Sequence, residues 1–273
     1  MRTIDRAVGA VLGSAVGDAL GAPFEFGLPG VFRERFPDGR GEMCGGGGWD
    51  PGEATDDTQM AVLVGESLLE RGGLDLPDIF RRFRSWAAAD PKDIGLQTEA
   101  VLSSGDSWDT AAARHFQVNG RAAGNGSLMR EGTALLHELV RVALLGEDPS
   151  AALPEALAAV APAHRARWAV VLAPDWHPDD ATEFNGAVWP CLGSAVWALR
   201  TTASFEEALA VAIDLGGDTD TVAAVTGLLA GAVHGAGAIP ARWTEPLHVP
   251  LPGHGPRTLR SDDLRALATA LIA

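Results

Sequence analysis

The chain has 273 residues, of which 47% are hydrophobic, and its 21 basic and 36 acidic side chains give a net charge of −15. This length suits one large domain or two small ones. The negative charge argues against a nucleic-acid backbone as the main partner, because phosphate binding requires patches of lysine and arginine. Two cysteines, Cys44 and Cys191, do not make a disulfide framework, so we expect reduced thiols in a cytoplasmic protein.

Two apolar stretches have the length of a targeting or membrane segment. Residues 1–22 contain early arginine and small apolar residues, as a weak signal peptide does, but Asp5 and Asp18 interrupt the pattern. Residues 221–239 are about as long as a membrane span, yet they are mostly alanine and glycine and include His234. We therefore predict no membrane association, and a buried central helix for the second stretch.

Apolar residues recur at helical spacing along almost the whole chain, and no stretch alternates convincingly with a period of two. No low-complexity linker or change of composition divides the chain. We therefore predict an all-α fold, a compact single-domain bundle of roughly a dozen helices over residues 1–273. The predicted helices cover residues 3–20, 55–70, 76–89, 95–104, 107–116, 127–145, 150–160, 163–172, 188–200, 204–214, 219–236 and 261–272.

Several of these predicted helices have start signals. Pro77 and Pro154 suit a first helical turn, where the backbone N–H has no intrahelical acceptor. Ser107, Ser204 and Ser261 suit N-cap positions, because a hydroxyl accepts a hydrogen bond from a free backbone N–H. These signals support the predicted boundaries.

Two predicted helices carry glycine at every fourth position. A glycine inside a helix is less favourable than alanine by about 0.8–1 kcal/mol, so a repeated glycine needs an offsetting contact. One interpretation is relaxed composition in a chain rich in alanine and glycine. The other, which we favour, is close approach between neighbouring helix backbones in the core. The stripes are Gly9, Gly13, Gly17 and Gly21 in the first helix, and Gly227, Gly231 and Gly235 in the late one.

One loop is unusually long for a compact domain. Residues 22–54 show no extended helical pattern and include four consecutive glycines at 45–48. Structureless loops longer than about 12–15 residues are often functional or disordered. This loop begins with PFEF and ends with PGEATDDT, so it leads directly into a cluster of acidic residues.

Carboxylates and hydroxyls are concentrated at two predicted helix starts, TDDTQM at 55–60 and GGDTDT at 216–221. Each cluster has an ordinary interpretation as an N-cap, and Asp56 with Gln59 fits a capping box. One cap, however, needs one side chain, whereas each start offers two carboxylates and at least one hydroxyl. The second interpretation is that the two starts meet and share bound cations.

Charge repulsion decides what such a meeting requires. Two carboxylates about 4 Å apart repel by about 4 kcal/mol at an effective dielectric constant near 20, whereas a helix dipole stabilises an anion by only about 0.3–1 kcal/mol. Oxygen donors suit Mg²⁺, Mn²⁺ or Ca²⁺, and four carboxylates suit two ions about 3.5–4 Å apart that activate a water. The candidate ligands are Thr55, Asp56, Asp57, Asp218, Asp220 and Thr221.

Five segments, in this order, resemble the ADP-ribosylglycohydrolase family. They read GDALGAPFE at 17–25, PGEATDDTQMA at 51–61, KDIGLQTEAVLSSG at 92–105, GRAAGNGSLMR at 120–130 and GGDTDTVAAVTGLLAGAVHG at 216–235. TDDT alone is a weak signal, whereas TDDT, GNGSLMR and GGDTDT in this order are a strong one. The resemblance implies an all-α fold around a central dinuclear Mg²⁺ or Mn²⁺ site, and the six candidate ligands match the family's ligands without substitution.

The resemblance also implies roles for residues that are not metal ligands. Glu25 matches an acidic residue on a mobile loop, which implies a general acid or base, or a gate over the ligand. Asp93, Gly95 and Thr98 match a loop that approaches the ligand, and Gly95 at a helix start suits a diphosphate site, a capping turn being the alternative. The segment that wraps ADP-ribose is matched by Gly124, Asn125, Gly126 and Ser127, although Asn-Gly is also an ordinary turn.

The chain departs from the family pattern in three places. GNGSLMR is followed by EGTALL rather than by a small residue and proline, and the Thr-His segment expected further on is missing, with His137 as a weakly supported substitute. The chain also has no tyrosine to stack on adenine. Phe24, Phe26, Trp49 or Trp189 could take that role, although each also suits packing or loop surface. These departures leave the metal ligands intact and the substrate open.

The resemblance implies a metal-dependent hydrolase that cleaves the glycosidic bond between ADP-ribose and a modified target, with two divalent cations, Mg²⁺ or Mn²⁺, as cofactors. The alternatives are a non-catalytic ADP-ribose-binding or structural family member, and a two-metal nucleotide phosphohydrolase. The expected partner is an ADP-ribosylated protein, a nucleic acid base or a small-molecule conjugate of ADP-ribose. We expect a cytoplasmic monomer without an extended nucleic-acid surface.

Overall fold

The computed structural model describes residues 2–120 and 130–273, and its regular structure is almost entirely helical. The all-α prediction is therefore confirmed. A small antiparallel sheet of β1 (His248–Pro250) and β2 (Thr258–Arg260) was not predicted. The longer helices are α1 (Thr3–Gly21), α3 (Asp56–Arg71), α4 (Leu76–Ala87), α5 (Leu96–Ser103), α6 (Ala111–Asn119), α7 (Arg130–Leu145), α8 (Pro149–Ala159), α9 (Pro162–Val171), α10 (Val188–Thr201), α11 (Phe205–Ile213), α12 (Thr219–His234) and α14 (Ser261–Leu271). The shorter ones are α2 (Val31–Arg35), α13 (Ala241–Thr244) and the 3-10 helices η1 (Ala22–Phe24), η3 (Pro178–Asp180) and η4 (Ala236–Ala238).

Every predicted helix corresponds to an observed one, with small differences at the ends. The prediction for residues 107–116 is the least accurate, because residues 107–110 form a turn and α6 begins only at Ala111. Ser107 is therefore not a helix cap, and its hydroxyl instead donates a hydrogen bond to Asp109 at 2.5 Å. Residues 127–129 of the helix predicted at 127–145 lie outside the described residues.

The remaining start signals are partly correct. Pro77 lies in the first turn of α4 and Ser204 caps α11, as predicted. Pro154 instead lies inside α8, because Asp148 caps that helix at an earlier position by accepting a hydrogen bond from a backbone N–H. Ser261 is the first residue of α14 rather than its cap, and its hydroxyl donates to a backbone carbonyl of α13.

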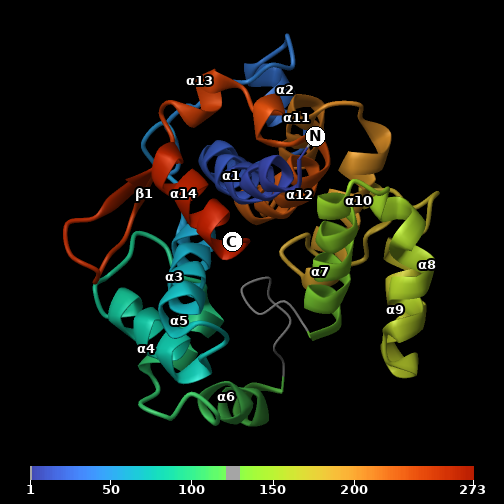
Figure 1. Cartoon of the computed structure of the whole chain (residues 1–273). Helices are drawn as coiled ribbons and strands as arrows, with labels where there is room; N and C mark the ends of the chain where they lie inside the picture. Colours follow the sequence, from blue (N-terminus) through green and yellow to red (C-terminus); the bar gives the residue numbers. More distant parts are fainter. Residues whose placement is uncertain (1, 121–129) are drawn as a thin grey trace.

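Helices α1 and α12 lie side by side at the centre of the molecule, with their backbones in direct contact (Figure 1). A Cβ atom built on Gly9 would lie 2.3 Å from the Gly231 oxygen, one on Gly13 would lie 2.2 Å from the Gly227 oxygen, and one on Gly17 would lie 2.0 Å from the Ala223 oxygen. The residue numbers of the contacted α12 residues fall as those of the α1 glycines rise, so the two helices are antiparallel. Close backbone approach, the interpretation favoured for the glycine stripes, is therefore confirmed.

The same contact explains the apolar composition of the two helices. Within the described part of the chain, residues 3–24 are long and apolar enough to cross a membrane, but 83% of that apolar window is buried inside the protein. Helix α12 is likewise buried along most of its length, as predicted for a central helix. Both stretches therefore have the burial of core helices.

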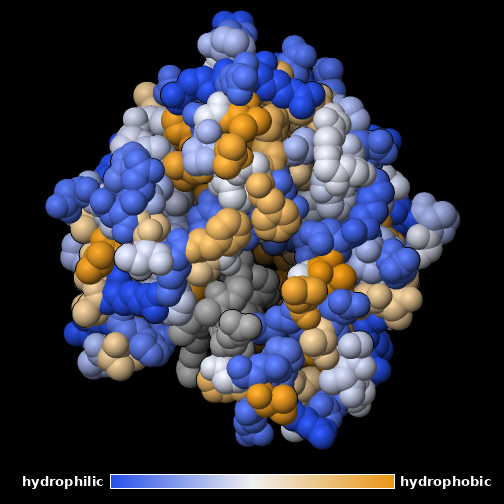
Figure 2. Space-filling view, turned by 180° about the vertical axis from the view of Figure 1, so that it is seen from behind, coloured by the Kyte–Doolittle hydropathy of each residue, from blue (hydrophilic) through white to orange (hydrophobic). Residues whose placement is uncertain are grey.

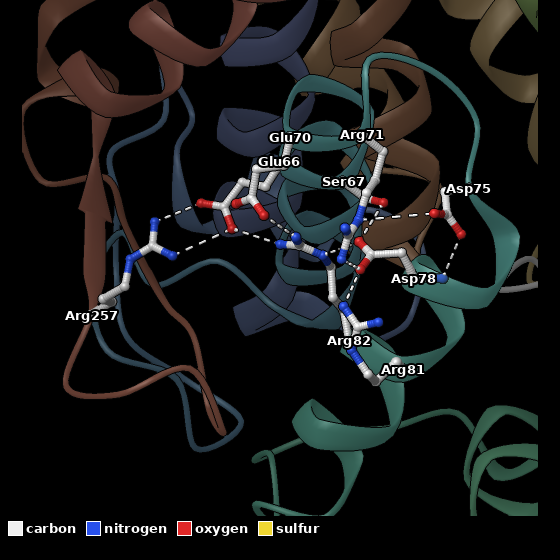
Figure 3. A network of polar contacts seen from close by, with 9 residues as sticks. All are labelled: Glu66, Ser67, Glu70, Arg71, Asp75, Asp78, Arg81, Arg82 and Arg257. Atoms are coloured by element: carbon white, nitrogen blue, oxygen red, sulfur yellow. Dashed lines mark hydrogen bonds and ion pairs between the residues drawn. The ribbon is translucent and has the colours of Figure 1, made fainter.

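A network of charged side chains holds α4 and the β-hairpin on α3 (Figure 3). The buried carboxylate of Asp78 in α4 accepts hydrogen bonds from Ser67 and Arg71 of α3 at 2.8 and 2.7 Å, and from Arg82 at 2.7 Å. The hydrogen bonds from the two arginines hold the pKa of Asp78 well below its usual value. Arg257, next to β2, pairs with Glu66 of α3 at 2.6 Å. The end of α3 far from the acidic cluster is therefore held by charge pairs.

Replacing Gly17 by alanine should destabilise the protein by about 1–3 kcal/mol or more, as overpacked cores do, because the added Cβ atom would lie 2.0 Å from the Ala223 oxygen. Gly65→Ala in α3 is the matched control. There the Cβ atom would meet only side-chain ends, those of Leu267 at 3.3 Å and of Leu271 at 3.5 Å, and alanine favours the helix by about 1 kcal/mol. Urea unfolding measures both variants. An unchanged midpoint for Gly17→Ala would contradict the backbone contact.

Candidate active site

The N-termini of α3 and α12 meet at one cavity of about 420 Å³. Asp56 and Asp57 reach the cavity from the first turn of α3, and Asp220 reaches it from the first turn of α12. The two acidic clusters therefore do lie together, while their metal-binding role stays a prediction. The predicted site residues that line the cavity are Glu25, Asp56, Asp57, Asp93, Gly95, Thr98, Asp218, Asp220 and Thr221.

The other predicted site residues do not line the cavity or are not described. Thr55 is fully buried immediately before α3. Gly124, Asn125, Gly126 and Ser127, predicted to wrap ADP-ribose, lie outside the described residues.

The capping interpretation of the first acidic cluster does not hold, because a residue of α1 caps α3 instead. The fully buried carboxylate of Asp18 accepts hydrogen bonds from the backbone N–H groups of Thr55 and Thr58, each at 3.1 Å, and from the Thr58 hydroxyl. The Gln59 side chain bonds to Ala54 and to the ring N–H of a tryptophan, so it makes no capping box. Asp56 and Asp57 are thus left to face the cavity.

The second cluster is positioned by a turn that the loop after Glu25 holds in place. Gly216 and Gly217 both have left-handed backbone angles, with φ of 69° and 74°, which glycine adopts without strain. Gly217 exchanges backbone hydrogen bonds with the Phe26–Gly27 segment, at 2.6 and 3.0 Å. The side chain of Asn185 also donates to the Gly216 oxygen at 2.7 Å and accepts from the Asp218 N–H at 3.0 Å. The glycine pair therefore lets the chain enter α12 with its acids directed at the cavity.

Negative charge is concentrated in this cavity. Six of the described lining residues are acidic and none is lysine, arginine or histidine. Glu25, Asp93 and Asp220 each place a carboxylate oxygen within 4.8 Å of the other two. This arrangement makes Asp93, predicted as a ligand-contacting residue, also a candidate cation ligand.

The carboxyl groups respond to this crowding with raised pKa values. Burial, followed by the charges of Asp93 and Asp218, raises the pKa of Glu25 to about 7. Burial and the charge of Asp93 also raise the pKa of Asp56 to about 7, although hydrogen bonds from backbone N–H groups, including that of Gly95, oppose the change. Without a counter-ion, therefore, the site resists carrying its full negative charge near neutral pH.

The deepest carboxylates are affected in the same way. Burial, reinforced by neighbouring carboxylates, raises the pKa of Asp57 and of Asp220 well above the usual value. Burial also raises the pKa of Asp18 to about 6, even though the hydrogen bonds from Thr58 and Thr55 lower it. These acids share one environment, and a positive charge in the cavity would stabilise the ionised form of each.

Unpartnered oxygen atoms indicate what kind of positive charge fits. The Thr55 hydroxyl and one carboxylate oxygen of Asp57 are buried and have no hydrogen-bond partner within the described part of the chain. Such atoms are unfavourable unless something binds them. The available donors are hydroxyl and carboxylate oxygens, the set preferred by Mg²⁺, Mn²⁺ and Ca²⁺. Both cysteines are free, as expected. The residues present thus fit hard divalent cations.

The four aromatic residues considered for stacking on adenine differ clearly in solvent exposure. Phe24, Trp49 and Trp189 are buried, at 6%, 8% and 8% exposure, so their role is packing. Phe26 is 73% exposed and lines the cavity. His137 lies exposed on α7 and is not among the described lining residues, so nothing in its position supports the substitution considered above.

Sequence reasoning missed Asp18 and Asn185, although both shape the site. The signal for Asp18 was present, because an acid between two glycines of a glycine-striped apolar helix, at positions 17 and 21, must find a buried hydrogen-bond donor. No comparable signal marked Asn185, which acts only through a contact with a segment 31 residues further along the chain.

Comparison with known proteins agrees with the site. The family model described as ADP-ribosylglycohydrolase matches residues 1–137 and 130–273. The chain is 31% identical over 277 residues to ADP-ribosyl-[dinitrogen reductase] glycohydrolase of Rhodospirillum rubrum, covering 89% of this chain and 90% of that protein. It is 30% identical over 290 residues to the ADP-ribosylarginine hydrolase Tri1 of Serratia proteamaculans, covering 90% and 76%.

The fold comparison reaches the same result. A solved structure described as an ADP-ribosylglycohydrolase-related protein complex is 34% identical, with a TM-score of 0.74, and the match covers 99% of this chain and 98% of that one. The chain therefore belongs to the ADP-ribosylglycohydrolase family.

Proposed function

We propose that the protein is a hydrolase that cleaves the glycosidic bond between ADP-ribose and a modified target, with two divalent cations, Mg²⁺ or Mn²⁺, as cofactors. Family membership supports the reaction class. The single observation that carries the cation requirement is the meeting of two acidic helix starts at a cavity with six acidic and no basic described lining residues. The whole chain acts as one catalytic domain in this proposal.

Six residues would hold the cations, and these are Thr55, Asp56, Asp57, Asp218, Asp220 and Thr221. When bound, the two ions supply charge compensation and Lewis acidity toward water and the ribose hydroxyls. Glu25 would exchange a proton at its carboxylate oxygens, since it lines the cavity and lies within 4.8 Å of carboxylate oxygens of Asp93 and Asp220. Asp18 would keep the α3 start in place, because it accepts the backbone hydrogen bonds of Thr55 and Thr58 there.

The remaining residues would orient the substrate. Asp93, Gly95 and Thr98 line the cavity and would contact the ribose or the diphosphate. In the overall reaction water replaces the bond from C1′ of ribose to the leaving group with a C1′ hydroxyl, and the second proton of that water goes to the leaving group. The names of the relatives point to protein targets, and one of them specifies arginine. We propose an ADP-ribosylated protein as the partner, acted on by a cytoplasmic monomer.

Hydrolysis should require a divalent cation and should release ADP-ribose. The assay offers ADP-ribose linked to arginine, serine, a nucleobase or a small acetyl ester, each with Mg²⁺, Mn²⁺ or a chelator, and chromatography identifies the product. Undiminished activity in the chelator would argue against the cation requirement. Release of AMP or phosphate would support the alternative of a phosphohydrolase, and heat of ADP-ribose binding without any product would support a non-catalytic binder.

The variants Asp57→Asn and Asp220→Asn should abolish turnover and yet stabilise the protein in a chelator. Each removes one buried negative charge and keeps the size of the side chain, and the melting temperature should rise by about 2–4 °C for each kcal/mol of relieved repulsion. Stabilisation by Mg²⁺ should be lost at the same time. Glu42→Gln, at an exposed position, is the control and should change neither property. A lower melting temperature in the chelator would contradict the charge argument.

In a chelator, stability should fall as the pH rises from about 5 to 8. Glu25 and Asp56 have pKa values of about 7 in the folded protein, against 4.5 and 3.8 as model values. The folded state therefore binds protons more strongly than the unfolded state, and the stability present at low pH is lost as the pH passes 7. Saturating Mg²⁺ should flatten this slope. Melting temperatures measured across the pH range in EDTA and in Mg²⁺ test this, and a melting temperature that rises with pH in EDTA would contradict it.

A further inference from the structure

Two phenylalanine rings stack on each other beside the acidic cavity. Phe26 follows Glu25 in the chain, and Phe184 belongs to the segment before α10. Their ring centres lie 6.4 Å apart with an interplanar angle of 22°. The rings remain 73% and 56% exposed, and Phe26 lines the cavity. The face opposite to that of Figure 1 is mostly hydrophilic, with hydrophobic residues beside a central hollow (Figure 2).

Phe26 has a backbone conformation that its side chain disfavours. Its φ is +58°, a left-handed value that a residue with a bulky side chain seldom adopts. The Phe26 N–H donates to the Gly217 oxygen at 2.6 Å and the Gly217 N–H donates to the Gly27 oxygen at 3.0 Å, so the surrounding turn enforces this conformation. A glycine would fit here without strain. Because the ring is mostly exposed, packing does not account for a phenylalanine at this position.

The ring pair adjoins carboxylates on both sides. Glu25 immediately precedes Phe26. On the other side, a Cβ atom built on Gly186 would lie 2.9 Å from the Phe184 ring and 2.6 Å from a carboxylate oxygen of Asp218. A group resting on the rings would therefore also lie close to carboxylates of the cavity.

This combination favours one chemical class of ligand. A guanidinium group is planar, stacks on aromatic faces and carries a positive charge that the ring face attracts. The acidic cavity adds attraction, and none of its described lining residues is basic. A neutral nucleobase would gain only the stacking, without the attraction between opposite charges. We propose that Phe26 and Phe184 are specificity-determining residues that hold the guanidinium of ADP-ribosylated arginine, an inference that rests on the proposed hydrolase function.

The test removes the ring without adding strain. Phe26→Gly should raise KM for an ADP-ribosylarginine peptide by about 3- to 30-fold, the range of a cation–π contact, and change KM for an ADP-ribosylserine peptide by less than about twofold. Phe26→Trp should restore the arginine preference. The melting temperature of Phe26→Gly should equal or exceed that of the wild type, because the glycine relieves the backbone. Phe116→Leu, which alters a ring exposed on α6, is the matched control and should change nothing.

A binding measurement separates failure of this inference from failure of the proposed function. Calorimetry in saturating Mg²⁺ should show that ethylguanidinium binds the wild type more tightly than Phe26→Gly, and that ethylammonium, of equal charge but unable to stack, binds the wild type more weakly than ethylguanidinium does. Cleavage of the serine-linked peptide with none of the arginine-linked one would overturn the inference and leave the hydrolase intact. Equal KM changes for both peptides, or a lowered melting temperature, would also overturn it. If no conjugate is cleaved, the proposed function fails, and ethylguanidinium binding still decides the role of the rings.

Discussion

The contact between the backbones of α1 and α12 sets the geometry on which the site depends. It extends to the very start of α12, where a Cβ atom on Gly21 would lie 2.4 Å from the Thr219 oxygen. Asp220, the next residue, is therefore placed by this contact. Asp18 lies on the same α1 helix and binds the first backbone N–H groups of α3. One helix thus positions both acidic helix starts, and a shift of α1 would move the carboxylates relative to one another.

The site concentrates negative charge, and none of its described lining residues is basic. The peripheral network around Asp78 shows the contrast, because each carboxylate there has an arginine partner and the pKa of Asp78 is lowered. In the cavity the carboxylates face one another, two buried oxygen atoms have no partner in the described chain, and the pKa values are raised. Aspartate therefore stabilises the fold in the network around Asp78 and destabilises it in the cavity. Such opposition is expected where function requires a ligand to complete the charge balance.

Phe26, a residue with a strained backbone, lies in the same neighbourhood. Gly216 and Gly217 adopt left-handed backbone angles without strain. Gly217 forms hydrogen bonds with the segment that contains Phe26, and Phe26 adopts a similar angle that is unfavourable for its bulky side chain. The loop that carries Glu25 and the turn that carries Asp218 are therefore one unit. A residue held in an unfavourable conformation at the rim of a cavity, with its ring exposed, is typical of ligand contact rather than of packing. The long loop from Ala22 to Ala54 serves this unit, because its first turn carries Glu25 and its last residues precede α3.

The sequence by itself determined the all-helical fold, the close approach of two glycine-striped helices and the two acidic clusters, because helical periodicity, glycine spacing and residue chemistry are local properties. It also provided the motifs by which the family could be identified. Only the tertiary structure decided that Asp18, rather than Asp56, caps α3, and that Asn185 and Phe184 lie beside Asp218. Only the tertiary structure likewise decided the small sheet and the residues at which α6, α8 and α14 begin. In each case several residues could make the same hydrogen bond or contact. Tertiary packing decides which of them lies close enough, and a local sequence pattern contains no information about that.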